Sequence, residues 1–239
     1  MTEQPLNRSF LVIDVEKSSD RANSAQTVLR ADLYAMVDEA LGTAGLAVNQ
    51  YAVEDRGDGV MVVADTGVLD VLDPVAEVVV EALARRNATV APPDWMRLRI
   101  AVHHGLVHRD AHGWTGDALT TTFRINNMKP VKDVLRSADR AQSVLVVSDA
   151  VYRDVVCQGY RGLQPGTYRE VADDERTAWV RVPGYAAPPG VATGPAAAEP
   201  VARGQAITIN GSQIGSVHTA ERVDRVDARS YFGQSEVRR

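Results

Sequence analysis

The 239-residue sequence contains a single cysteine, and only 5% of its residues are aromatic. One cysteine cannot form a disulfide within the chain, so a fold held together by disulfides is excluded. Cys157 falls in the apolar-periodic stretch 150–157, and no neighbouring residue marks it as a nucleophile. We therefore expect Cys157 to be a small residue of the core.

Long apolar runs and an excess of positive charge are also missing. The sequence has no run of about 18 apolar residues and no signal-like start, so we expect a cytoplasmic protein without a membrane span. The net charge is −5, which argues against a nucleic-acid partner or an anionic membrane. The chain is nevertheless 45% hydrophobic, enough to bury one full-sized core, and this predicts one domain with appendages.

The periodicity of the apolar residues predicts an α+β domain. Helical spacing is present over 25–44 and over 74–86, where Pro74 suits a helix start. With the strand-like stretches, the expected order is βαββαβ, a ferredoxin-like antiparallel sheet with helices on one face. The expected strands of this core are 8–13, 46–53, 60–64 and 98–105. Extra C-terminal helices and strands are expected at 117–126, 132–138, 143–147, 148–157 and 177–182.

The composition changes after residue 182. Residues 183–205 are rich in Pro, Gly and Ala and read as a linker without its own core. Residues 206–239 hold a short β-prone segment around Asn210-Gly211, followed by a charged tail. Such a small hairpin is marginal by itself, so we expect residues 206–220 to dock on the domain or on a partner protein.

Two aspartates follow turn or strand signals. The apolar run Phe10–Ile13 ends at Asp14, and Asp58 lies near the tip of a predicted hairpin whose glycines, Gly57 and Gly59, permit a tight turn. Carboxylates held on adjacent strands offer hard oxygen ligands that suit Mg²⁺ or Mn²⁺ better than zinc. Taken singly, Asp14 fits a helix-side cap better than a metal ligand, and Asp58 fits an ordinary turn residue better, because Asp-Gly is above all a turn signal; the two segments together favour the metal site.

Ser18, Ser19 and Asp20 follow the first aspartate and can cap a helix or expose backbone N–H groups to an anion. Four histidines, His103, His104, His108 and His112, also cluster in the sequence. They have no cysteine partner, and the first two point to opposite faces of a strand, so a zinc site is disfavoured.

Three further motifs follow the two aspartate segments, at 97–105, 113–117 and 120–124. In this order the motifs resemble the class III nucleotidyl cyclase homology domain, the fold of adenylate, guanylate and bacterial pyrimidine cyclases. The resemblance covers residues 8–182. It is nearest in type to compact stand-alone bacterial domains, some of which are pyrimidine cyclases of anti-phage signalling systems.

The resemblance implies a two-metal site and a dimer. Asp14 and Asp58 would ligate two Mg²⁺ or Mn²⁺ ions, with the Val15 carbonyl as a further ligand. In the family, the metal ligands come from one subunit, whereas base contacts and transition-state groups come from the other. A homodimer with shared active sites is therefore expected, and a monomer is expected to be inactive.

Other positions match the family pattern less completely. Arg124 matches the arginine that steadies charge on the phosphate, whereas Thr120 stands where the family usually has an asparagine that orients the ribose. Glu54 and Gly113 occupy the base-reading positions in place of a lysine and an aspartate, which disfavours ATP and favours GTP or a pyrimidine nucleotide. A salt bridge from Glu54 to Arg56 or to a neighbouring strand is the alternative. The family's triphosphate lysine has no clear match, and Arg169 or Arg161 is the expected substitute.

The sequence thus predicts an enzyme that converts a nucleoside triphosphate to a 3′,5′-cyclic mononucleotide and pyrophosphate. Thr120, Gly113 and the missing lysine keep a second hypothesis open, a degenerate cyclase fold that binds a nucleotide or serves as a partner module. A third, a structural assembly protein driven by the tail, rests only on the pattern of residues 207–217.

Overall fold

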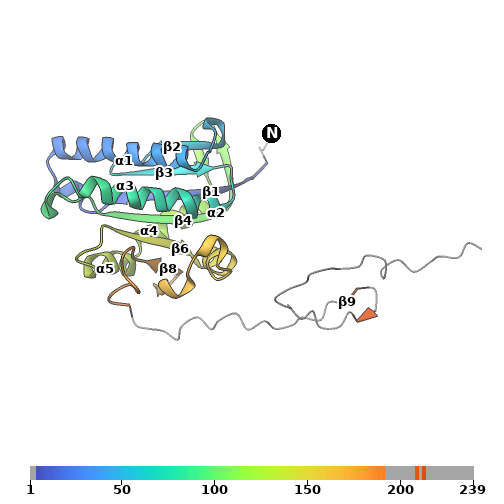
Figure 1. Ribbon diagram of the computed structural model, residues 1–239. Helices are drawn as coiled ribbons and strands as arrows, with labels where there is room; N and C mark the ends of the chain where they lie inside the picture. The colour runs from blue at the N-terminus through green and yellow to red at the C-terminus, as the bar shows by residue number, and fades with distance from the viewer. Residues whose placement is uncertain (1–3, 192–207, 210–211, 214–239) are drawn as a thin grey trace, which may run out of the picture. The chain divides into compact units, whose positions relative to one another are not determined.

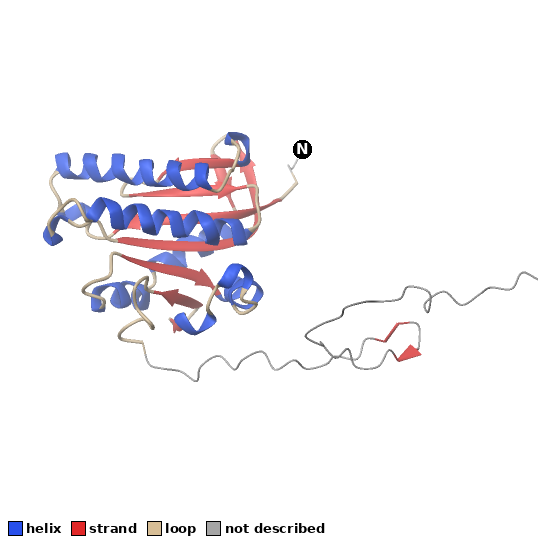
Figure 2. Ribbon diagram, in the orientation of Figure 1, coloured by secondary structure: helices blue, strands red, loops and turns tan. Residues whose placement is uncertain are grey.

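The computed structural model describes residues 4–191, 208–209 and 212–213. Residues 4–191 contain a mixed sheet with helices on both faces (Figures 1 and 2). No helix in the described ranges is long and apolar enough to cross a membrane.

The first half of the domain has the predicted βαββαβ order. Strands β2 (Tyr51–Asp55), β3 (Gly59–Ala64), β1 (Leu6–Val15) and β4 (Leu98–Asp110) lie side by side in that order, and every neighbouring pair is antiparallel. Helices α1 (Asn23–Thr43) and α3 (Glu77–Asn87) provide the two crossovers. This confirms the ferredoxin-like core.

The second half extends the sheet beyond β4. Strand β6 (Ser143–Ser148) runs parallel to β4, followed by antiparallel β8 (Thr177–Arg181) and β7 (Arg169–Ala172). Strand β5 (Gly113–Thr115) was not predicted; it pairs with the outer end of β4, which is why β4 continues past residue 105. At the end of β6, Ser148 caps the predicted helix, beginning with α6 (Asp149–Val151), by accepting the Val151 N–H at 3.3 Å.

The two helices of the ferredoxin-like core, α1 and α3, share one face of the sheet as predicted, and C-terminal helices cover the other face. One core cluster joins α1 and α3 to residues such as Leu11, Ile13 and Val62. A second cluster joins α4 (Asp117–Asn127) and α5 (Lys129–Ser137) to the alternate residues Phe10 and Val12. Because strand side chains alternate between faces, both faces of β1 are apolar and both require a cover.

Pro74 stands at a helix start, as expected. Turns at Val68–Asp70 (α2) and Val71–Ala76 precede α3, and within them Asp73 alone leaves helical geometry, at φ −146° and ψ 111°. The residue before a proline disfavours the helical conformation, so the helical path restarts at Pro74 and continues into α3. One strand start differs from the expectation. Strand β2 starts at Tyr51 rather than 46, because Val48–Gln50 form a 3₁₀ turn stabilised by the Ala47 N–H donating to Gln50 Oε1.

The C-terminal part is described only in pieces. Tyr185 and Val191 pack against the second core cluster, so the beginning of the predicted linker contacts the domain. Strands β9 (Thr208–Ile209) and β10 (Ser212–Gln213) pair antiparallel, as expected around Asn210-Gly211. The rest of the predicted linker and tail, including most of the predicted partner contact at 206–220, lies outside the described residues.

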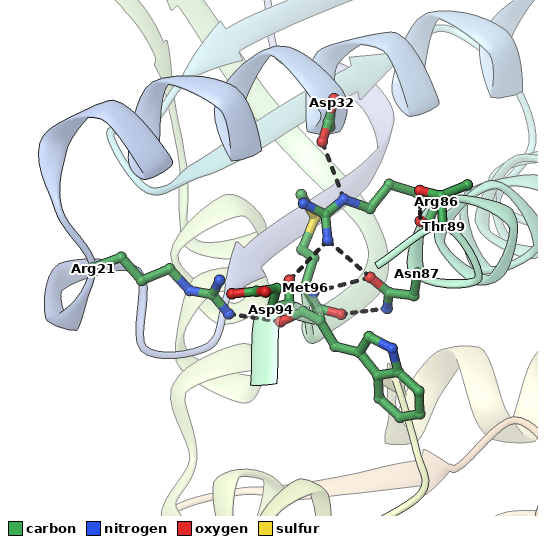
Figure 3. Close-up of polar contacts among 8 residues, drawn as sticks. Arg21, Asp32, Arg86, Asn87, Thr89, Asp94 and Met96 are labelled. Carbon is green, nitrogen blue, oxygen red and sulfur yellow. Dashed lines mark hydrogen bonds and ion pairs between the residues drawn. The ribbon is translucent and has the colours of Figure 1, made fainter. Parts of the chain in front are cut away.

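A polar bridge fixes α3 to the segment that leads into β4. The buried Asn87 amide donates to the Met96 carbonyl at 2.8 Å and accepts the Met96 N–H at 3.0 Å. Figure 3 shows this pair beside Arg86, which donates to Asp32 of α1 and to the Asp94 carbonyl. The bridge provides hydrogen-bond partners for the Met96 N–H and carbonyl, which precede β4 and are not paired by a strand.

We expect Asn87→Ala to lower the free energy of unfolding by about 3 kcal/mol, because an unsatisfied buried polar group costs roughly 1–3 kcal/mol and two are created. Urea denaturation measures the loss. The control is Asn127→Ala, which removes an exposed amide that donates to the Phe123 carbonyl. Equal losses in the two variants would contradict a structural role for the Asn87 bridge.

Candidate functional site

Asp14 lies near the end of β1, and Asp58 lies in the turn that leads into the neighbouring strand β3. Asp14 is the penultimate residue of β1 and pairs with Gly59 of β3. Asp58 precedes Gly59 in the turn between β2 and β3, and its carbonyl accepts the Val15 N–H at 3.1 Å. The structure therefore brings both predicted carboxylates, and the Val15 backbone, to one end of the β1–β3 pair.

Gly59 makes this approach possible. A Cβ placed at Gly59 would lie 2.3 Å from the Ile13 carbonyl oxygen, a distance that real Cβ atoms do not reach. Only glycine allows β3 to start this close to β1.

Asp14 has a partner that the sequence analysis missed. Arg99, its register neighbour on β4, forms an ion pair with Asp14 Oδ2, and both side chains are largely buried. Burial lowers the pKa of Arg99 from its ordinary value. A charged residue inside the apolar run 98–102 was the available signal, because a buried arginine needs an acidic neighbour.

The chain just after Asp14 is held by a second arginine. Arg97 donates to Glu16 Oε2 at 3.0 Å and to the carbonyls of Ala138 and Ala141 at 2.9 Å. It also donates to the Leu135 carbonyl. The end of β1 is thus fixed to the C-terminal end of α5.

A cavity of about 310 Å³ lies between α1 and the tip of the β2–β3 hairpin. Asp58, Val15 and the buried Ser18 line it, together with Asn23, Thr27 and Arg30 of α1. Ser19 is exposed and does not line this cavity. Ser18–Asp20 form a separate 3₁₀ turn and do not cap α1, whose N-cap is Ala22, because two residues separate that turn from the helix.

Thr120 and Arg124 lie one turn apart on α4, and both are exposed. The Thr120 hydroxyl donates to the Gly116 carbonyl at 3.1 Å. In the described part of the chain, no hydrogen bond or ion pair joins either residue to Asp14 or Asp58.

The two expected base-reading positions are neighbours within one chain. A Cβ at Gly113 would lie 3.5 Å from Glu54 Oε1, so the two residues face each other. Glu54 also accepts a 2.7 Å ion pair from Arg56, which is the alternative that the sequence left open. Arg56 in turn lies 5.6 Å from the ring centroid of Phe123 on α4.

The expected phosphate-binding arginines lie apart from the aspartates. Arg169 begins β7, which β8, β6 and β4 separate from β1, and it donates to the Gly166 and Tyr168 carbonyls at 2.7 Å. Arg161 pairs with Asp70 at 2.5 Å. Neither arginine joins the cavity next to Asp58.

The histidine cluster does not form a metal site. His103 Nδ1 lies 2.7 Å from Ser148 Oγ, and the His103 and His104 ring centroids are 5.8 Å apart. Within the described ranges, no group of three or more His, Cys, Asp or Glu side chains could hold a metal ion. Burial, with the neighbouring His104, lowers the pKa of His103 to about 4.

The oxygen donors at Asp14, Asp58 and Val15 nevertheless fit Mg²⁺ or Mn²⁺. Mg²⁺ is usually bound by one or two carboxylates and completed by substrate phosphates and water, so three protein carboxylates are not required. Asp58 is exposed, and among the described residues its carboxylate has no ion-pair partner. Asp14 is shared with Arg99.

Comparison with solved structures finds cyclase domains. The chain is similar to an adenylate/guanylate cyclase/hydrolase from Silicibacter pomeroyi, with 19% identity and a TM-score of 0.55 over 75% of this chain and 98% of that one. A bacterial light-regulated adenylyl cyclase shares 14% identity at a TM-score of 0.54, over 76% of this chain and 92% of that one. The guanylyl cyclase Cya2 shares 16% identity at a TM-score of 0.52, over 80% and 98%.

No family model matches the sequence, and no curated protein matches it. The similarity therefore concerns the fold: residues 4–191 have the architecture of class III cyclase domains.

The lowered pKa of His103 predicts a pH dependence of stability. Between about pH 4 and 6.5 the unfolded chain binds a proton at this histidine that the folded chain does not, so this contribution to stability is lost as the pH falls through that window. We expect His103→Gln to lose less unfolding free energy over this range than the wild type, as measured by urea denaturation at each pH. His112→Gln, which replaces an exposed histidine, should follow the wild type. Parallel curves for all three proteins would contradict the prediction.

Proposed function

We propose that this chain is a divalent-metal-dependent nucleotidyl cyclase that acts as a homodimer. The observation that carries the proposal is that Asp14 of β1 pairs with Gly59, the residue after Asp58, so that both aspartates lie at one end of two adjacent strands of a cyclase fold, next to a cavity that Asp58 lines. All three donor groups are oxygens, as Mg²⁺ and Mn²⁺ prefer. Bound metal would activate the ribose 3′-hydroxyl and neutralise the leaving pyrophosphate.

The protein's own groups divide the remaining work. The planar guanidinium of Arg124 would stabilise charge on the α-phosphate, and the Thr120 hydroxyl would orient the ribose. In the reaction, a bond forms between the 3′-oxygen and the α-phosphorus, the bond to pyrophosphate breaks, and the hydroxyl proton passes to solvent.

A dimer explains why the groups do not meet in one chain. Among the described residues, no hydrogen bond or ion pair joins Thr120 or Arg124 to the two aspartates, whereas Glu54 and Gly113 face each other, and Arg56 beside them lies over Phe123 of α4. We infer that the base positions and α4 of one subunit complete the metal site of the other.

Glu54 favours a base that offers an N–H group. Its carboxylate accepts from donors on guanine, on uracil N3 or on cytosine N4, and Gly113 leaves space beside it. We propose GTP or a pyrimidine nucleotide as substrate, and a signalling role for the cyclic product. A role in anti-phage defence remains a prediction from the resemblance.

The alternative is a nucleotide-binding module. Two observations favour it: the Thr120 hydroxyl is already bonded to Gly116, and Asp14 is already paired with Arg99.

The direct test incubates the purified protein with ATP, GTP, CTP and UTP plus Mn²⁺ and resolves the products by mass. A cyclic mononucleotide is expected from at least one nucleotide other than ATP. If the protein binds nucleotide in a metal-dependent way but forms no product from any of the four nucleotides, the enzyme hypothesis is wrong and the binding-module hypothesis takes its place.

We expect Asp58→Ala to abolish product formation while the fold persists, because Asp58 is exposed and contributes little to packing. Product yield and far-UV circular dichroism provide the two readouts. The matched control is Asp174→Ala, which removes an exposed aspartate between β7 and β8. Unchanged product formation in the Asp58 variant would contradict the two-aspartate site.

Mixed dimers test the shared site. Asp58→Ala chains and Arg124→Ala chains should each be inactive alone, and their heterodimers should recover up to about half of the activity per dimer, since one of two sites is then intact. Chains carrying different affinity tags allow the heterodimer to be isolated before the assay. No recovery in verified heterodimers would place each complete site within one chain.

A further inference from the structure

Arg30 connects helix α1 to the turn that carries Asp58. Its guanidinium forms an ion pair with Asp55 at the end of β2, and Nη1 also donates to the Gly57 carbonyl at 3.1 Å. The same guanidinium lies 5.0 Å from the ring centroid of Tyr34, one helical turn further along α1. One side chain thus bonds both the end of β2 and the turn that follows it.

Asp55 closes the network from the other side. Its Oδ1 accepts the Gly57 N–H at 3.0 Å in addition to the Arg30 guanidinium, so both backbone polar groups of Gly57 are bonded. The hydrogen bond from Arg30 lowers the pKa of Asp55. Gly57 has φ +78°, a conformation that glycine adopts readily and that other residues avoid.

The residue after Gly57 is Asp58, and its backbone is held on the other side by β1, through the bond between the Val15 N–H and the Asp58 carbonyl. The turn therefore has two supports. The β1 support is built from backbone, whereas the α1 support depends on the Arg30 and Asp55 side chains.

We propose that Arg30 and Asp55 are positioning residues, which hold the β2–β3 turn so that the exposed Asp58 carboxylate meets the metal ion together with Asp14. This inference rests on the proposed function, because the position of the turn matters for metal binding only where Asp58 is a metal ligand. It assigns to this chain a support that neither the aspartate motif nor the cyclase resemblance includes.

A competing role for Arg30 follows from its place in the cavity beside Asp58. A cation there can contact the substrate phosphates directly. The two roles differ in what Asp55 does. If Arg30 supports the turn, Asp55 is required for metal binding; if Arg30 binds phosphate, Asp55 competes with the phosphate for the guanidinium.

The experiment uses the full chain with Arg30→Gln, Asp55→Asn and the double variant. Mn²⁺ binding is measured from the electron paramagnetic resonance signal of free Mn²⁺, without nucleotide, and amide hydrogen exchange is measured across residues 55–59. We expect each single variant to weaken Mn²⁺ binding about tenfold, the scale of losses on removing supports of metal ligands. The double variant should be no weaker than the single ones, because the two residues act as one unit. Exchange at Gly57 should accelerate in all three.

The matched control is Arg85→Gln. Arg85 also forms an exposed ion pair with an acidic partner, Glu39 of α1, away from the cavity. It should leave Mn²⁺ binding and exchange at Gly57 unchanged, and Arg30→Lys should keep part of the Mn²⁺ affinity by retaining a charge for Asp55.

Three outcomes overturn the inference. The first is that the variants behave like the Arg85 control, and the second is that the wild-type chain binds no Mn²⁺. The third is that Arg30→Gln weakens only nucleotide binding while Asp55→Asn has no effect. The last outcome assigns Arg30 to the phosphates. Failure of the proposed function looks different, since the wild type would then bind Mn²⁺ through Asp58 and form no cyclic product.

Discussion

The pairing of β1 with β3 at Gly59 is the constraint on which the site depends. The two backbones approach so closely there that a methyl group at residue 59 would overlap the Ile13 carbonyl. This contact fixes the register, the register sets Asp14 opposite Gly59, and chain continuity then puts Asp58 beside them. A slip of one residue would turn Asp14 to the other face of the sheet. The chemistry proposed for the two carboxylates is therefore built on a steric requirement at a residue without a side chain.

Around this contact, arginines provide most of the polar support. Arg97 binds backbone carbonyls at the end of α5 and Glu16 after β1, Arg99 pairs with Asp14, and Arg30 spans the hairpin turn. Each guanidinium offers several donors in a fixed plane, so one side chain can satisfy groups from separate segments. The end of β1 is consequently attached to α5, and the β2–β3 turn beside it to α1 on the other face of the sheet.

Much of the fold could be predicted because its core elements have clear periodicity. The apolar runs of β1 and β3 and the helical spacing of α1 led to the correct ferredoxin-like order. The helix start expected at Pro74 also agrees with the structure, because the helix breaks at Asp73 and restarts at Pro74. The short strand β5 was missed, because three residues carry no periodicity.

The acidic residues of the candidate site could be predicted from the sequence, whereas the arginines that contact them or their turn could not. Asp14 and Asp58 stand next to strand and turn signals, and the motif order identified them. Arg99 is marked in the sequence as a charge inside an apolar run, but its partner follows only from strand register, and Arg30 acts through the packing of α1, which leaves no local pattern. Glu54 and Gly113 were predicted from the resemblance as one base-reading pair, and the structure brings the two residues face to face.

The ion pair between Arg99 and Asp14 bears on the metal binding proposed for Asp14. A cation at Asp14 would meet a carboxylate that is already paired with a buried guanidinium. Its binding free energy would then be a difference between two attractions. A divalent ion, with twice the charge of the guanidinium, would gain from the exchange, whereas a monovalent ion such as K⁺ would not. In the proposed site, the ion pair would thus select divalent over monovalent cations at Asp14.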